Sequence, residues 1–216
     1  FRRQKVLQGV NLEIKTGETM VIIGRSGCGK SVLLKHIIGL LRPDSGKVYV
    51  DDQEVSALGA LELKDLRKRF GMLFQGSALF DSLTVGENIA LPLKEHRAIN
   101  NGKVAEIVTR KLKLVGLSGI ESMKPAELSG GMKKRVGLAR AIAMDPQYVL
   151  YDEPTTGLDP IMADKINELI RQLQKDLAIT SIAVTHDMQS AFKIADRIAM
   201  LFEGKIIFLG TPLEIQ

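Results

Sequence analysis

The sequence predicts an α/β protein with a mixed, mostly parallel sheet and an inserted α-helical subdomain. Three observations support this fold class. Apolar strand-like runs alternate with amphipathic helical patterns towards both ends of the chain, a glycine-rich loop joins one such strand to a helix, and the middle of the chain reads as helix alone. We expect residues 1–216 to form one domain, in which residues 1–88 and 148–216 make the α/β core and residues 89–147 make the helical subdomain.

Length and composition set limits on the class of protein. A chain of 216 residues with 45% apolar content can bury one sizeable core. No apolar run approaches the roughly eighteen residues that a membrane-spanning helix requires, so we expect the chain to be soluble by itself. A single cysteine, Cys28, excludes an internal disulfide and fits a reducing compartment. The net charge of +5 suits polyanionic ligands or an anionic membrane face, but such a charge more often serves solubility and carries little weight.

The first part of the chain reads as two strands, a glycine-rich loop and a helix. Residues 6–14 alternate as a strand does, residues 15–18 form a turn, and residues 19–23 are a buried strand. The segment after the loop is expected to be a helix whose apolar face consists of Val32, Leu33, Ile37 and Ile38.

The region that follows changes from strand to helix. Residues 47–50 and 70–74 are predicted strands, with a polar helix over residues 61–68 between them. A second helix is expected from Gly130 through Met144, before Pro146 stops it. Ahead of it, a first helix is indicated by apolar residues at helical spacing: Val104, Ile107, Val108, Leu112 and Val115.

The last part of the chain alternates again. Residues 148–152, 179–184 and 197–202 are apolar enough to be buried strands, and helices over residues 159–176 and 187–195 separate them. Alternating strands and helices predict a parallel sheet that is covered on both faces.

The glycine-rich loop has the pattern G-x-x-x-x-G-K-S, which is typical of a phosphate-binding loop. Its glycines let backbone N–H groups curl around phosphates, and the positive end of the following helix dipole favours the same anions. Lys30 would contact the β- and γ-phosphates, and the Ser31 hydroxyl would bind Mg²⁺. An ordinary glycine-rich turn is the plainer alternative. The candidate nucleotide-binding residues here are Gly24, Arg25, Ser26, Gly27, Cys28, Gly29, Lys30, Ser31 and Val32.

Two carboxylates and a histidine follow predicted strands. Asp152 and Glu153 would lie at the carboxyl edge of the sheet, beside the phosphate loop. Asp152 is suited to holding Mg²⁺, and Glu153 to orienting and deprotonating the water that attacks the γ-phosphate. A helix-capping acidic pair before Pro154 is the alternative. His186 ends another strand and could reach the same phosphate, although a lone histidine is usually structural.

A second candidate anion site begins the helix near residue 130. Ser129, Gly130 and Gly131 combine a hydroxyl, a flexible backbone and a helix amino terminus. One nucleotide already has its phosphate loop, so this site makes sense if it serves the nucleotide of another copy, in a head-to-tail pair around two ATP molecules. Taken in isolation, an ordinary helix cap would be the favoured reading.

Six motifs in order resemble those of the ATP-binding cassette (ABC) ATPases over essentially the whole chain. The phosphate loop is followed by Gln75, which is similar to the family's Q-loop, by LSGGM as the signature, and by VLYDE as the Walker B strand. Residues 157–159 resemble the D-loop, and His186 the switch histidine. The resemblance implies the ABC ATPase fold, with a RecA-like P-loop NTPase core and a helical subdomain.

The resemblance also implies roles and a reaction cycle. Phe1 occupies the position whose ring stacks on adenine, Asp159 contributes to nucleotide binding, and Gln75 contacts Mg²⁺ or the attacking water. ATP would join two cassettes until its hydrolysis releases them, and Gln75 would transmit the change to a membrane partner. The signature departs from the usual LSGGQ because Met132 replaces the glutamine; we expect activity to survive, since the serine and glycines make the phosphate contacts.

Within the family, the chain looks most like the ATPases of Mla-type and Mce-associated lipid transporters. The similar segments are GMLFQGSALFDSLTVGENIALPL, LSGGMKKR and DEPTTGLDPI. This implies a homodimer on the cytoplasmic face of the inner membrane, with an integral membrane permease, a lipid-binding Mce-type partner, and phospholipid as cargo. Leu79, Phe80 and Leu83 form either a groove for a permease helix or part of the core.

Other functions stay open. The ATPase of an amino-acid or methionine importer would keep every catalytic residue. A soluble ABC ATPase acting on nucleic acid would normally carry tandem cassettes or a long coiled coil, and this chain has neither, so we expect no nucleic-acid partner. A small P-loop kinase would leave LSGGM and His186 without a role, and an inactive regulator would be expected to lack Glu153 or His186.

Overall fold

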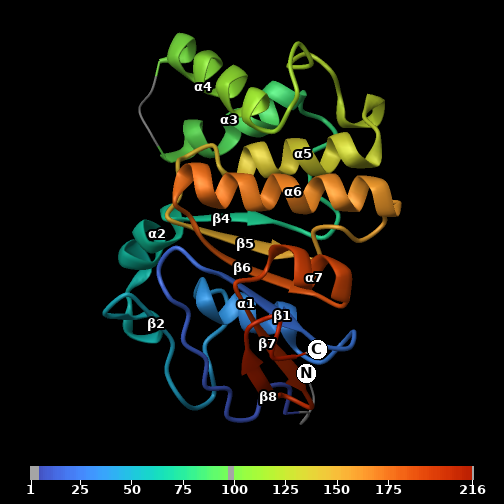
Figure 1. Ribbon diagram of the computed structural model, residues 1–216. Coiled ribbons are helices and arrows are strands. Elements are labelled where there is room, and N and C mark those ends of the chain that lie inside the picture. Colours follow the sequence, from blue (N-terminus) through green and yellow to red (C-terminus); the bar gives the residue numbers. More distant parts are fainter. Residues whose placement is uncertain (1–4, 97–99, 216) are drawn as a thin grey trace.

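The computed structural model describes residues 5–96 and 100–215, so Phe1 lies outside the described residues. A six-stranded sheet runs through the molecule (Figure 1). Its strands are β1 (Thr19–Ile23), β4 (Phe70–Leu73), β5 (Tyr148–Asp152), β6 (Thr180–Thr185), β7 (Arg197–Phe202) and β8 (Lys205–Gly210). They lie in the order β4-β5-β6-β1-β7-β8, and every neighbouring pair is parallel except β7 and β8. The predicted mixed, mostly parallel sheet is confirmed.

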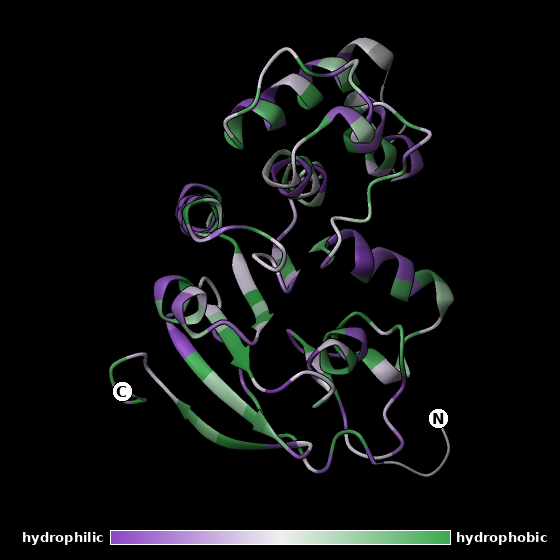
Figure 2. Cartoon of the chain, turned by 90° about the vertical axis from the view of Figure 1, so that its right-hand side faces the viewer, coloured by the Kyte–Doolittle hydropathy of each residue, from purple (hydrophilic) through white to green (hydrophobic). Residues whose placement is uncertain are grey.

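Both faces of the sheet are buried, because the central strands are apolar at successive positions. On one face, Met20 and Ile22 of β1 pack with Leu33 and Leu34 of helix α1 (Lys30–Ile37). On the other face, Val21 and Ile23 belong to the main core. That face is covered by α5 (Gly130–Ala141), α6 (Pro160–Leu177) and α7 (Met188–Ile194) (Figure 1). Figure 2 shows the apolar colouring along the strands and the polar sides of the surrounding helices.

The middle of the chain is helical, as expected. Helices α3 (Val85–His96) and α4 (Asn101–Leu114), with a short 3₁₀ turn η2 (Pro125–Glu127), lie beyond α5 at one end of the molecule (Figure 1). All five residues on the predicted apolar face of α4 are buried in the main core. The division into core and subdomain at residues 89 and 147 stays a prediction.

A small unit covers one side of the sheet. It consists of the hairpin β2 (Tyr49–Val50) and β3 (Gln53–Glu54), the 3₁₀ turn η1 (Val55–Ala57) and helix α2 (Ala60–Lys68). Val50, Val55 and Leu66 form its buried centre, which contacts Phe70 and Tyr148 of the main sheet. Among the described residues, none of the helices combines the length and the apolar character needed to cross a bilayer.

Two expectations from the sequence are wrong in detail, and one strand was not expected. Residues 6–14 are not a strand. Their side chains alternate in exposure, but Gly9 has a φ of +75°. Within the described part of the chain, their one backbone-to-backbone hydrogen bond to a distant segment runs from the N–H of Gln8 to the carbonyl of Gly204, at 2.7 Å. Helix α5 ends at Ala141 instead of Met144, because Ile142 leaves the helical conformation. The edge strand β8 was not predicted at all.

Candidate functional site

The glycine-rich loop lies between the end of β1 and the start of α1, as the motif predicts. Gly27 and Gly29 have φ angles of +80° and +106°, which side chains disfavour. A Cβ atom on Gly24 would lie 2.4 Å from the carbonyl oxygen of Leu201, so the loop needs glycine there. Helix α1 has neither a side-chain cap nor an acidic residue in its first turn. Its amino end therefore fits an anion that accepts hydrogen bonds from backbone N–H groups.

Lys30 brings a buried positive charge to the centre of this loop. Its side chain is 6% exposed, and its Nζ donates hydrogen bonds to the carbonyls of Gly24 at 2.7 Å and Arg25 at 3.2 Å. The same ammonium lies 3.5 Å from Oε1 of Glu153. A buried ammonium beside a free helix amino end can hold the phosphates of a nucleotide.

Ser31 and Asp152 bring two oxygen ligands together from distant parts of the chain. The Ser31 hydroxyl at the start of α1 donates to Oδ1 of Asp152, at the end of β5, over 2.9 Å. Within residues 5–96 and 100–215 no group of three acidic, histidine or cysteine residues could hold a metal by itself. A hydroxyl and one carboxylate suit Mg²⁺, which usually completes its shell with phosphate oxygens and waters.

Glu153 directly follows β5 and is held from several sides. It is 8% exposed and its φ is +51°, an unusual value for a residue with a side chain. Its backbone N–H donates to the carbonyl of Val184 at 2.9 Å, which ties it to β6. Its Oε2 accepts from Thr156 Oγ1 at 3.2 Å and from Thr185 Oγ1 at 3.4 Å. The carboxylate is thus fixed beside Lys30, where a general base would be needed.

His186 contacts the same carboxylate. Its Nδ1 lies 2.9 Å from Oε2 of Glu153, and its side chain is 54% exposed, so the ring can reach a ligand on the outer side. The next residue, Asp187, caps α7 by accepting hydrogen bonds from Gln189 and Ser190. This cap fixes the chain direction just after the histidine.

Gln75 follows β4, and its side chain is exposed. Its carbonyl accepts a hydrogen bond from Nζ of Lys134, which also donates to the carbonyl of Glu153 at 3.2 Å. Burial lowers the pKa of Lys134, and the nearby charges of Glu153 and Asp152 oppose that shift. Sequence reasoning missed Lys134; its helical spacing from Gly131 and Leu138, both buried, was the available signal.

The Ser129–Gly131 turn lies apart from the phosphate loop. Ser129 caps α5 by accepting from the N–H of Met132 at 3.3 Å, and it is exposed. A Cβ atom on Gly131 would lie 2.2 Å from Cε of Met162, so this turn packs closely on the start of α6. Asp159, which caps α6, lies at the same helix start. In the described part of the chain, no hydrogen bond or ion pair joins Ser129, Gly130 or Gly131 to the phosphate loop.

The structure therefore divides the predicted site residues into two groups. The loop residues Gly24 to Val32 lie with Asp152, Glu153 and His186 at the carboxyl edge of the sheet, and Lys134 connects Gln75 to them. The exposed residues Ser129, Gly130 and Asp159 form a separate surface at the starts of α5 and α6.

Comparisons with known proteins identify a shared sequence family. The family described as ABC transporter matches residues 7–156. The probable ribonucleotide transport ATP-binding protein mkl of Mycobacterium leprae is 42% identical over 100% of this chain and 62% of its own length. The intermembrane phospholipid transport system ATP-binding protein MlaF of Haemophilus influenzae is 43% identical over 97% of this chain and 80% of its own. The methionine import ATP-binding protein MetN of Carboxydothermus hydrogenoformans is 44% identical over 99% and 63%.

A solved structure extends the likeness to three dimensions. The dimeric, post-hydrolysis ATP-binding cassette MJ0796, bound to ADP and Pi, superposes with a TM-score of 0.87 at 36% identity, over 96% of this chain and 90% of that one. The chain spans about three fifths of the length of the mkl relatives, 60 to 62%.

Proposed function

The chain belongs to the ABC transporter family, and from this premise we propose that it is the ATP-hydrolysing subunit of a membrane transporter. One observation carries the proposal: Lys30 and His186 contact the two oxygens of a single buried carboxylate, Glu153, beside the phosphate loop. A positioned base next to a phosphate-binding cation is the arrangement that hydrolysis of a nucleoside triphosphate requires.

The residues at the carboxyl edge of the sheet have different roles in this proposal. The loop N–H groups and Lys30 bind the β- and γ-phosphates, and Glu153 accepts a proton from the attacking water. His186 orients Glu153 and contacts the γ-phosphate. Ser31, Asp152 and Gln75 would hold Mg²⁺, which neutralises phosphate charge when bound. The adenine-stacking role of Phe1 belongs to the same proposal.

Two copies of the chain act together in this proposal. Ser129, Gly130 and Gly131 lie at a helix amino end, where Ser129 and Gly130 are exposed and Gly131 is buried, and no described hydrogen bond links them to their own phosphate loop. They suit the γ-phosphate of a nucleotide held by a second copy, with Asp159 on the same surface. The dimeric state of the MJ0796 cassette supports a pairing of two copies.

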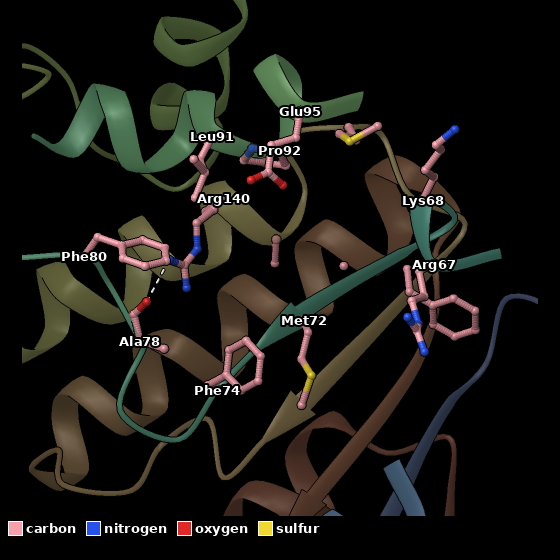
Figure 3. A pocket seen from close by; sticks show the side chains of 14 residues that line it. Arg67, Lys68, Met72, Phe74, Ala78, Phe80, Leu91, Pro92, Glu95 and Arg140 are labelled. Carbon is pink, nitrogen blue, oxygen red and sulfur yellow. Dashed lines mark hydrogen bonds between the residues drawn. The ribbon is translucent and has the colours of Figure 1, made fainter. Parts of the chain in front are cut away.

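A cavity between β4, α3 and α5 is the proposed contact with the permease (Figure 3). It has a volume of about 350 Å³ and an opening lined by exposed aromatic rings, since Phe74 is 41% and Phe80 52% exposed. Such a cavity suits a short apolar helix of a membrane partner. Of the three residues predicted for this groove, Phe80 lines the cavity, Leu79 packs on the main core, and Leu83 is not one of the lining residues.

The cargo proposed is phospholipid, moved with the help of a lipid-binding Mce-type protein from a position on the cytoplasmic face of the inner membrane. The relative MlaF, which is named for intermembrane phospholipid transport, supports this choice. The importer of methionine stays the second candidate, because MetN relatives are equally similar.

The cargo assignment is tested by purifying the chain from its native host in mild detergent and identifying the integral membrane protein that copurifies with it. A permease of a lipid transporter that raises ATP hydrolysis when reconstituted in phospholipid vesicles is the expected result. An amino-acid permease in its place would transfer the assignment to the methionine-importer class. ATP hydrolysis that is absent with any copurified permease would refute the transporter ATPase itself.

A further inference from the structure

Helix α5 holds the loop that follows β4 at two points. Arg140 donates from Nη2 to the carbonyl of Ser77 at 2.7 Å. It also donates from Nη1 to the carbonyl of Ala78 at 2.8 Å (Figure 3). Ser77 and Ala78 have φ angles of +61° and +46°. Two successive residues with side chains in this region are costly, so the loop needs outside contacts to keep its shape.

The second contact is Lys134, six residues earlier on the same helix. Its side chain is buried, 5% exposed, and its ammonium donates to the main-chain carbonyls of Gln75 and Glu153. Burying a charge costs free energy unless partners compensate. Here the partners of the ammonium are two carbonyls from two separate loops of the candidate site, so the charge joins these loops.

Between the two cations the helix packs so closely on the end of β4 and on the loop that a side chain in place of Gly137 would clash. A Cβ atom on Gly137 would lie 2.7 Å from Cδ1 of Leu73 and 3.3 Å from Cβ of Ser77. Lys134, Gly137 and Arg140 therefore form one continuous contact, along a helix whose first turn is capped by Ser129.

We propose that Lys134 is a positioning residue for hydrolysis, which keeps the main chains of Gln75 and Glu153 at a fixed separation and links both to the helix that Ser129 begins. The proposal rests on the proposed ATPase function. Lys134 does not touch the nucleotide; it acts through the base, Glu153, and through the loop of Gln75. If α5 shifts when Ser129 binds a phosphate, the ammonium of Lys134 would move the carbonyls of Gln75 and Glu153 with it.

The test compares Lys134→Met, Lys134→Gln and Lys133→Met in the purified chain. Methionine has a similar length but no donor, glutamine keeps N–H donors on a side chain one bond shorter, and Lys133 is the neighbouring, partly exposed lysine on the same helix. Steady-state kcat and KM for ATP, and ATP affinity by titration, are measured for each variant and for the unaltered chain.

We expect kcat to fall while the affinity for ATP stays nearly unchanged. Lys134→Met lowers kcat at least about tenfold, because small displacements of a base are costly, while ATP affinity stays within about twofold. Lys134→Gln falls between Lys134→Met and the unaltered chain, and Lys133→Met equals the unaltered chain. If Lys134→Met does not fold, Lys134→Gln alone must show this fall in kcat at nearly unchanged affinity.

Contrary outcomes separate this inference from the proposed function. An unaltered kcat in Lys134→Met, or a parallel loss of kcat and ATP affinity, overturns the positioning role and leaves the ATPase intact. If the unaltered chain binds ATP but does not hydrolyse it, alone or with its permease, both the positioning role of Lys134 and the proposed ATPase function are overturned.

Discussion

Nδ1 of His186 lies 2.9 Å from Oε2 of Glu153, whose other oxygen, Oε1, lies 3.5 Å from the ammonium of Lys30. The three residues come from the end of β6, the end of β5 and the start of α1, and parallel strands bring these ends to one edge of the sheet. Each oxygen of the carboxylate thus has its own partner, so Glu153 is held in one orientation.

Replacing Glu153 by glutamine is expected to stop hydrolysis and spare binding. The amide keeps the shape of the side chain but cannot accept a proton, so ATP turnover should fall at least about a hundredfold. ATP affinity, measured by titration calorimetry, should stay within severalfold of the unaltered value. Glu106→Gln, on the exposed side of α4, is the control and should leave turnover unchanged. Near-normal hydrolysis by Glu153→Gln would remove Glu153 as the base.

Replacing Lys30 by alanine is expected to weaken nucleotide binding. A hydrogen bond to a charged group contributes about 1.5–3 kcal/mol, which corresponds to roughly a ten- to hundredfold loss of ATP affinity. Lys35→Ala, exposed on the same helix, controls for the loss of a positive charge and should bind ATP normally. Undiminished affinity in Lys30→Ala would mean that the loop does not hold the phosphates.

Replacing Ser129 by arginine is expected to separate binding from pairing. The bulky cation would occupy the exposed turn that is proposed to meet the partner's nucleotide, while the phosphate loop of the same chain lies elsewhere. Titration should therefore give an unaltered ATP affinity, and analytical sedimentation in the presence of ATP should show monomers only. Pairing that persists in Ser129→Arg would exclude this turn from the contact between copies.

Asp196 is expected to make stability depend on pH. Burial raises its pKa, but hydrogen bonds from the N–H of Thr19 and from Arg171 outweigh that effect and hold the pKa below the usual 3.8. Since the folded pKa is depressed, the stabilisation is complete above pH 3.8 and is lost as the pH falls through the folded value.

Urea unfolding of Asp196→Asn measures this effect. At pH 7 the variant should be less stable by about 1 kcal/mol, and the difference should shrink below pH 3 as the native carboxylate becomes protonated. Asp81→Asn, which changes an exposed carboxylate, is the control and should show no such trend. A difference between Asp196→Asn and the unaltered chain that is the same at both pH values would contradict the linkage.

The strands of the sheet could be predicted because the central ones are apolar at successive positions, as strands buried on both faces are. The prediction of a strand over residues 6–14 was wrong because side-chain exposure alternates there without strand pairing. The apolar side chains of this segment cover the core, but Gly9 interrupts the extended backbone. The edge strand β8 was missed, and it pairs only with β7 in an otherwise parallel sheet.

The candidate site was predicted from motifs, and the structure adds what motifs do not contain. That Asp152 and Glu153 end a strand implied their place beside the loop, since strand ends share one edge. The positive φ of Glu153 and the buried ammonium of Lys134 depend on packing between α5 and two loops that are distant in sequence. From the sequence alone, a lysine in such a helix is predicted to lie on the surface, because the residues that pack around it are not known.

If ATP joins two copies of this chain, as we propose, the mass of Glu153→Gln in solution must rise when the nucleotide is added. Light scattering on the purified variant, with and without ATP and Mg²⁺, should give a monomer without nucleotide and, with it, a dimer containing two ATP molecules. A variant that binds ATP at full occupancy yet keeps the mass of a monomer at all protein concentrations would contradict the account.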